Sequence, residues 1–170
     1  MPNTYTLIAS STVGAGGAAS IDFTSIPSTY TDLCVALSLR TNNDPDAGTY
    51  GICAIAFNGS TANLTQKRLQ GSGSAASSFS FSNAQFPIDG LNNTASTFAN
   101  GSVYIPNYAG SANKSFSIDN VMEQNGTTTY MTLIAGLWSQ TAAINQLTFS
   151  AVSGNFVQYS TAYLYGVKNA

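Results

Sequence analysis

Charged residues are scarce in this chain of 170 residues, and histidine is absent. Only 7% of the residues are Asp, Glu, Lys or Arg, against about 25% in an average soluble domain. Triads in which a serine or cysteine is the nucleophile use a histidine as the base, so the sequence excludes that class of enzyme. The five Lys and Arg residues are spread along the chain, whereas nucleic-acid binding through phosphates needs clustered cations. We therefore expect neither activity.

Cysteines and long apolar runs are also rare. Cys34 and Cys53 are the only cysteines and lie in apolar, strand-like segments, which favours buried free thiols over a metal site. A cross-strand disulfide is the alternative, because the two segments look like neighbours in a hairpin. The chain lacks the roughly 18 consecutive apolar residues of a membrane helix, and its first residues do not resemble a secretory signal peptide. We expect cytosolic folding, no membrane segment and no cofactor.

Small polar residues take the place of the missing charges. Ser, Thr, Asn and Gly together supply 72 of the 170 residues, while 44% of the chain is hydrophobic and 11% aromatic. Disordered chains have few aromatic residues and many charges, so this composition indicates a folded chain with one core. We expect an N-terminal strand or arm with a Gly/Ala hinge over residues 1–17, followed by a single domain over residues 18–170.

Alternation of apolar and small polar residues predicts strands along the whole chain. In residues 31–41 the side chains alternate at a period of two, the pattern of a strand with one buried face. The apolar face consists of Leu33, Val35, Leu37 and Leu39, and the other face of Cys34, Ala36, Ser38 and Arg40. Turn formers such as Asn58-Gly59 and Asn125-Gly126 recur at the spacing typical of all-β domains. We predict an antiparallel β-sandwich of jelly-roll type, with roughly ten strands and no substantial helix.

The individual strands follow from the same pattern. We predict strands over residues 4–10, 20–24, 31–41, 49–57, 63–70, 98–105, 114–124, 127–138, 144–150 and 158–167, with a short one ending the Gly/Ser-rich segment 71–82. Segments 31–41 and 49–57 are expected to form a long hairpin, and residues 86–89 to be irregular. In segment 63–70, Lys67 or Arg68 should be exposed.

Three kinds of site are weighed against a purely structural role. A glycosidase needs two carboxylates about 5 to 9.5 Å apart, but the seven acidic residues mostly adjoin turns, where Asp bonds to local N–H groups. Asp44 and Asp46 offer oxygen ligands for Ca²⁺, although without the EF-hand spacing, and a turn is favoured. Aromatic residues near the C-terminus are favoured as core or interface residues over sugar-stacking ones; these are Trp138, Tyr159, Tyr163 and Tyr165.

Five segments resemble segments of structural proteins from tailed phages, especially those of aquatic bacteria and cyanobacteria. In chain order they are residues 21–33 (IDFTSIPSTYTDL), 57–59 (FNG), 103–108 (VYIPNY), 136–138 (GLW, with Ile144 following) and 160–167 (STAYLYGV). Together they span nearly the whole chain. The resemblance implies a virion component without enzymatic activity and supplies no catalytic, cofactor or metal-binding residue.

The expected function is that of a capsid decoration (cement) protein, made in the host cytoplasm and located in the virion. Its partners would be the major capsid protein or other virion proteins, and its own copies in a homotrimer. The alternative is a tail or head fibre or adhesin domain that binds a host-surface glycan. The assembly interface is expected to use five residues, Tyr5, Leu7, Tyr108, Tyr163 and Tyr165. The N-terminal residues either add a strand to a neighbouring subunit or form the first strand of their own sandwich.

Overall fold

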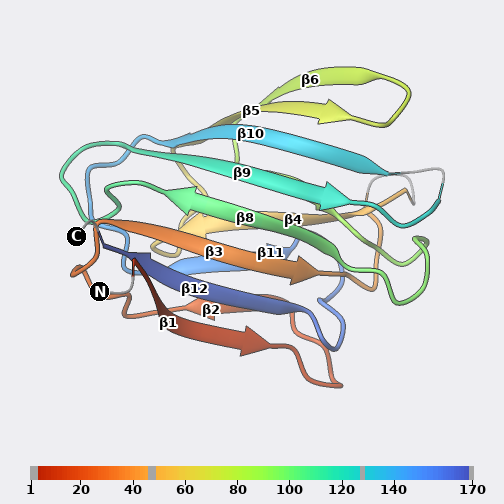
Figure 1. The fold of residues 1–170 in the computed structure, drawn as a ribbon, viewed down its shortest axis with the longest axis horizontal. Coiled ribbons are helices and arrows are strands. Elements are labelled where there is room, and N and C mark those ends of the chain that lie inside the picture. Colours follow the sequence, from red (N-terminus) through yellow and green to blue (C-terminus); the bar gives the residue numbers. More distant parts are fainter. Residues whose placement is uncertain (1–3, 46–48, 127–128, 169–170) are drawn as a thin grey trace.

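Twelve strands in two antiparallel sheets make up the fold (Figure 1), and the described residues contain no helix. The computed structural model describes residues 4–45, 49–126 and 129–168. The strands are β1 (Tyr5–Thr12), β2 (Ser20–Phe23), β3 (Asp32–Leu39), β4 (Gly51–Phe57), β5 (Leu64–Gly71), β6 (Ala76–Phe81), β7 (Gln85–Ile88), β8 (Ala99–Ile105), β9 (Lys114–Met122), β10 (Tyr130–Trp138), β11 (Leu147–Ala151) and β12 (Thr161–Val167).

The two sheets are unequal in size. The larger has the order β1-β12-β3-β8-β9-β10-β5-β6 and the smaller the order β2-β11-β4-β7. The first four strands alternate between the sheets, and β1 and β2 pair with the late strands β12 and β11. The all-β, helix-free sandwich is therefore confirmed. Jelly-roll topology stays a prediction, because eight and four strands are not the two equal layers of an eight-stranded jelly roll.

The core lies between the sheets, where the alternating faces meet. The four apolar residues predicted to share a face of β3 are at most 6% exposed, so that face was predicted correctly. Phe57 of the smaller sheet packs edge-on against Phe116 of the larger one, with ring centroids 5.4 Å apart, and lies 5.6 Å from the Trp138 ring. These contacts join the layers and place Trp138 in the core.

Two local predictions were wrong. Residues 31–41 and 49–57 do not form a hairpin, because β3 belongs to the larger sheet and β4 to the smaller one. Cys34 and Cys53 consequently lie on strands of different sheets, and both are free thiols. Residues predicted to be irregular form β7, which contains Pro87. A proline is tolerated there because β7 is an edge strand and one side of it makes no ladder bonds.

The N-terminal segment is part of the chain's own sandwich. β1 pairs with β12 from Tyr5 to Thr12 at the edge of the larger sheet. Hydrogen bonds continue across the expected boundary at residue 17, since Val13 N donates to Ser160 O at 2.8 Å and Ala18 N to Phe156 O at 3.0 Å. The Gly/Ala segment is thus tied to the body. Residues 1–3 of the expected arm, and Asp46 of the expected turn, lie outside the described residues.

Candidate interaction surface

The outer face of the larger sheet carries a stripe of exposed aliphatic side chains. Leu69 of β5 is 54% exposed, and β10 adds three residues that are 37–60% exposed, namely Met131, Leu133 and Leu137. The register explains the stripe, because Leu133 lies directly opposite Leu69 on one side and Asp119 of β9 on the other. Side chains two residues apart point to the same face of a strand. The stripe therefore follows β10 along its length.

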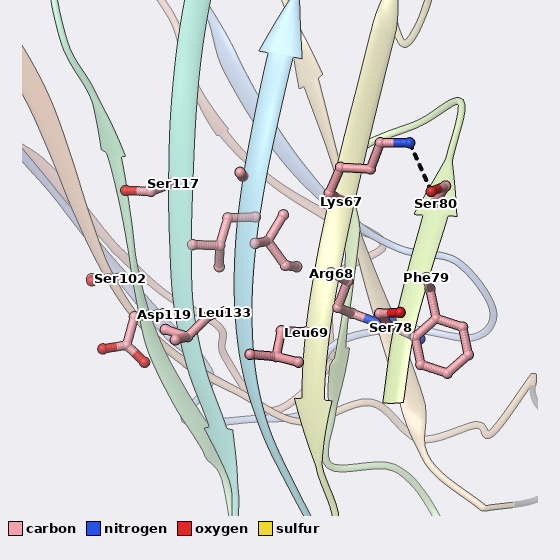
Figure 2. A pocket seen from close by; sticks show the side chains of 13 residues that line it. Lys67, Arg68, Leu69, Ser78, Phe79, Ser80, Ser102, Ser117, Asp119 and Leu133 are labelled. Carbon is pink, nitrogen blue, oxygen red and sulfur yellow. Dashed lines mark hydrogen bonds between the residues drawn. The ribbon is translucent and has the colours of Figure 1, made fainter. Parts of the chain in front are cut away.

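A hollow of about 620 Å³ lies over this part of the sheet. Figure 2 shows Leu69 and Leu133 on neighbouring strands at its middle, with Asp119 beyond Leu133. On the opposite side, Lys67 Nζ donates to Ser80 Oγ at 2.8 Å. The other outward-facing lining residues are small, namely Ser78, Ser102, Ser117 and Ala135. The hollow combines an apolar floor with hydroxyl groups, and its charged lining residues are two cations, Lys67 and Arg68, and one carboxylate, Asp119.

Most of the predicted interface residues gather at the other end of the same sheet. Tyr5 and Leu7 of β1 are exposed, Tyr163 of β12 is partly exposed and Tyr165 is half-buried. The Tyr5 and Tyr165 rings meet edge to face at 6.3 Å, and Leu7 lies directly opposite Tyr165 in the ladder. The structure thus brings four of the five residues together on the edge strand β1 and its neighbour β12.

Tyr108 does not belong to this surface, so its assignment to an interface was wrong. The side chain is fully buried in the core, and its hydroxyl donates to Pro27 O. Burial also raises the pKa of Tyr108. A side chain that is inaccessible in the folded chain supplies no contact area to a partner.

Tyr104 and Asp32 form a fixed pair between the two ends of the outer face. The Tyr104 hydroxyl donates to Asp32 Oδ2 at 2.5 Å, and Asn107 N donates to Oδ1 at 2.8 Å. The hydrogen bond to the Asp32 carboxylate raises the pKa of Tyr104 to about 12. These hydrogen bonds fix the end of β8 and the turn that follows it to Asp32 of β3.

Sequence reasoning missed the aliphatic stripe. In β10 the outward residues Met131, Leu133 and Leu137 alternate with inward residues that include Ile134 and Trp138. With apolar residues on both faces, a period of two does not tell which face is buried. The detectable signal was this two-sided apolar character, which is unusual for a strand with one face in water.

Two further charged side chains, Lys114 and Asp89, are buried in the structure. Lys114 Nζ donates to the carbonyl oxygens of Gly110, Ala112 and Thr141, and burial lowers its pKa. Burial raises the pKa of Asp89, an effect partly offset by the Thr97 hydroxyl and the Arg40 guanidinium. Within the described ranges, no group of three or more Cys, Asp or Glu side chains is placed to hold a metal ion.

None of the residues that the structure describes forms a helix with the length and hydrophobicity of a membrane span. Comparisons with protein-family models, curated proteins and solved structures gave no match to this chain.

Proposed function

We propose that this chain is a non-enzymatic structural protein of a tailed-phage virion and that it decorates the outside of the capsid shell. The observation that carries the proposal is the outer face of the larger sheet. It holds exposed aliphatic residues at one end, exposed tyrosines at the other, and mostly small polar residues between them. Exposed apolar patches on a folded protein are typical of protein–protein contact sites.

The chemistry of this face suits attachment to a shell. Burying one aliphatic side chain contributes about 1.5–3 kcal/mol when burial is complete, so the stripe alone supports a contact of modest strength. Added salt should lower the affinity of such a contact only slightly, because charged groups contribute little to its binding free energy. A shell presents many equivalent positions, and linked copies gain strength through avidity.

The partners in this proposal are the major capsid protein or other virion proteins, and further copies of the chain. The tyrosine-rich end formed by β1 and β12 is assigned to contacts between copies, because tyrosine supplies a large contact area with a polar tip. We propose a homotrimer for the assembled state, synthesised in the host cytoplasm and located in the virion.

A substitution on the outer face tests the proposal directly. Leu69→Asp places a carboxylate in the stripe at an exposed position, directly opposite Leu133 and Ser78 and not opposite another acid, so the isolated chain should keep its circular dichroism and unfolding midpoint. Binding to purified particles that lack the protein should fall at least tenfold. Val152→Asp is the matched control, because Val152 is 49% exposed and follows β11 of the other sheet. Equal particle binding by both variants would show that the outer face is not the attachment site.

Quantitative mass spectrometry of purified virions tests the location. Decoration requires copy numbers comparable to those of the major capsid protein. A handful of copies per particle would instead support the fibre or adhesin alternative, which binds a host-surface glycan. One observation favours that second candidate, namely an aromatic-lined hollow with amide groups on the other face of the larger sheet.

A further inference from the structure

The larger sheet extends beyond the smaller one at the end formed by β5 and β6. Figure 1 shows these two strands at one end of the molecule, past the layer that contains β4 and β11. A second hollow of about 620 Å³ opens there, between the inner face of β5 and β6 and the edge of the smaller sheet. Inward residues of the β5–β6 pair line this hollow. Two of them, Arg68 and Phe79, also line the first hollow, beside the outward residues Lys67, Leu69, Ser78 and Ser80.

Aromatic rings form much of its wall. Tyr50 and Tyr130 meet edge to face with centroids 5.3 Å apart, and Phe79 and Phe81 stack at 6.0 Å with an angle of 24° between their planes. Phe79 remains 39% exposed. Tyr50 is buried and Tyr130 and Phe81 are partly buried, so Phe79 on the edge strand β6 is the most accessible of the four rings.

Arg68 brings a positive charge into this aromatic setting. Its guanidinium carbon lies 4.7 Å from the Phe79 centroid and 4.9 Å from that of Phe81, and the residue is 7% exposed. Cation–π contacts of this kind hold a guanidinium in a fixed orientation. Among the described residues that line the hollow, Arg68 is the one charged side chain.

A buried amide completes the set. Gln70 is 8% exposed, and its Oε1 has no hydrogen-bond partner among the described residues. It follows Arg68 on the same face of β5 and also lines the hollow. An unpaired buried acceptor is unfavourable, and a ligand hydroxyl that donates to it would remove that cost. Gln85 lines the hollow as a second amide residue.

We propose that this hollow binds an acidic saccharide, that is, a sugar unit carrying a carboxylate. The aromatic faces suit the C–H face of a pyranose ring, the Gln70 oxygen suits a sugar hydroxyl, and the guanidinium of Arg68 suits the carboxylate through charge-assisted hydrogen bonds. The site goes beyond the proposed attachment role, which uses the opposite face of the sheet and needs no ligand here.

Calorimetry with matched probes tests the proposal. The first pair is trigalacturonate and its methyl ester, and the second is sialyllactose and its methyl ester; within each pair the sugar is the same and esterification removes the carboxylate charge. We expect at least one acid to bind ten times or more tighter than its uncharged match. Which acid binds distinguishes a uronic-acid source from a sialic-acid source. Equal affinities within both pairs, or binding of none of the four at millimolar concentration, would overturn the proposal.

Variants locate the site. Arg68→Met should weaken binding of the preferred acid at least tenfold. Lys67→Met is its matched control, because it removes the neighbouring cation on the other face of β5 and should leave affinity within twofold. Phe79→Ala, at an exposed position of an edge strand, keeps the test valid if Arg68→Met does not fold, and it should also weaken binding at least tenfold. An equal loss with Lys67→Met, or full affinity of a folded Arg68→Met or of Phe79→Ala, would refute the assignment. Virion copy number is unaffected by these outcomes, so the two proposals fail separately.

Discussion

The side chain of Gln66 on the larger sheet hydrogen-bonds both main-chain groups of Gln85 on the smaller one. Gln66 Nε2 donates to Gln85 O at 2.8 Å, and Gln66 Oε1 accepts from Gln85 N at 2.9 Å. Asn120 adds a bond from Nδ2 to Pro87 O at 2.7 Å. The free edge of β7 is thus occupied by amide side chains instead of another strand, which is one way to protect an exposed sheet edge.

Removing the two hydrogen bonds between Gln66 and Gln85, which bridge the sheets, should destabilise the fold. Gln66→Ala leaves the Gln85 N–H and C=O without these partners, so we expect the free energy of unfolding to fall by about 1–3 kcal/mol. Urea denaturation measures the change. Thr65→Ala, at the preceding exposed position of β5, is the control and should change stability little. Equal stability of the two variants would mean that water replaces the bridge at no cost.

Gly136 of β10 is required because an aromatic ring occupies its side-chain space. A Cβ there would lie 2.0–2.5 Å from ring carbons of Phe116, the residue directly opposite in β9. We expect Gly136→Ala to lower stability by about 1–3 kcal/mol, as overpacked cores do. Gly71→Ala is the matched control, since a Cβ at Gly71 meets nothing within 4 Å. Thermal unfolding of both variants measures the difference, and a Gly136→Ala chain as stable as wild type would contradict the packing described.

Stability should depend on pH through Tyr104. Its pKa in the folded chain is about 12, raised from 10.0 chiefly by the hydrogen bond to Asp32. A raised folded-state pKa means that the folded chain holds this proton more tightly than the unfolded chain does. The contribution is therefore complete below pH 10 and is lost as the pH rises from 10 to 12. Ultraviolet titration of the phenolates should show late-titrating tyrosines that include Tyr104 and Tyr108, and Tyr104→Phe should remove one of them. If both chains gave the same titration, the Asp32 bond would not be present in solution.

Leu37→Asp should prevent folding. Leu37 is 6% exposed on the inner face of β3, and a carboxylate there would be buried without a partner. Ser38→Asp is the control, because the next residue points to the outer face and should give a folded chain. Circular dichroism and gel filtration distinguish the two. A folded, monodisperse Leu37→Asp chain would show that β3 faces the other way.

The fold class was predictable because alternation in single strands is a local signal. β3 shows it clearly, and its buried face was predicted residue by residue. The partner of a strand is not a local property. The turn formers in residues 42–48 indicate that the chain reverses there, but they do not tell whether the next strand joins the same sheet or the facing one. The hairpin prediction for β3 and β4 failed for that reason.

The candidate sites were predictable only in part. Tyrosines near both ends of the chain suggested an interface, and the pairing of β1 with β12 brings four predicted residues together. The assignment of Tyr108 to that interface was wrong, because burial of a tyrosine depends on tertiary packing. The second hollow was missed because β5 turns polar residues inward. Lys67 is exposed whereas Arg68 is buried, a distinction that two adjacent cations do not reveal in sequence.

The position of β6 affects which residues of this protein can vary during evolution. This strand pairs with β5 alone, and its residues from Ala76 to Ser80 are exposed. Replacing them costs the core almost nothing, while the hydrogen-bond ladder to β5 depends only on main-chain atoms. Substitutions in β6 can thus change the side chains at the rim of the second hollow while the fold is retained. Variation among natural versions of this protein should concentrate on this strand before it reaches the layers beneath.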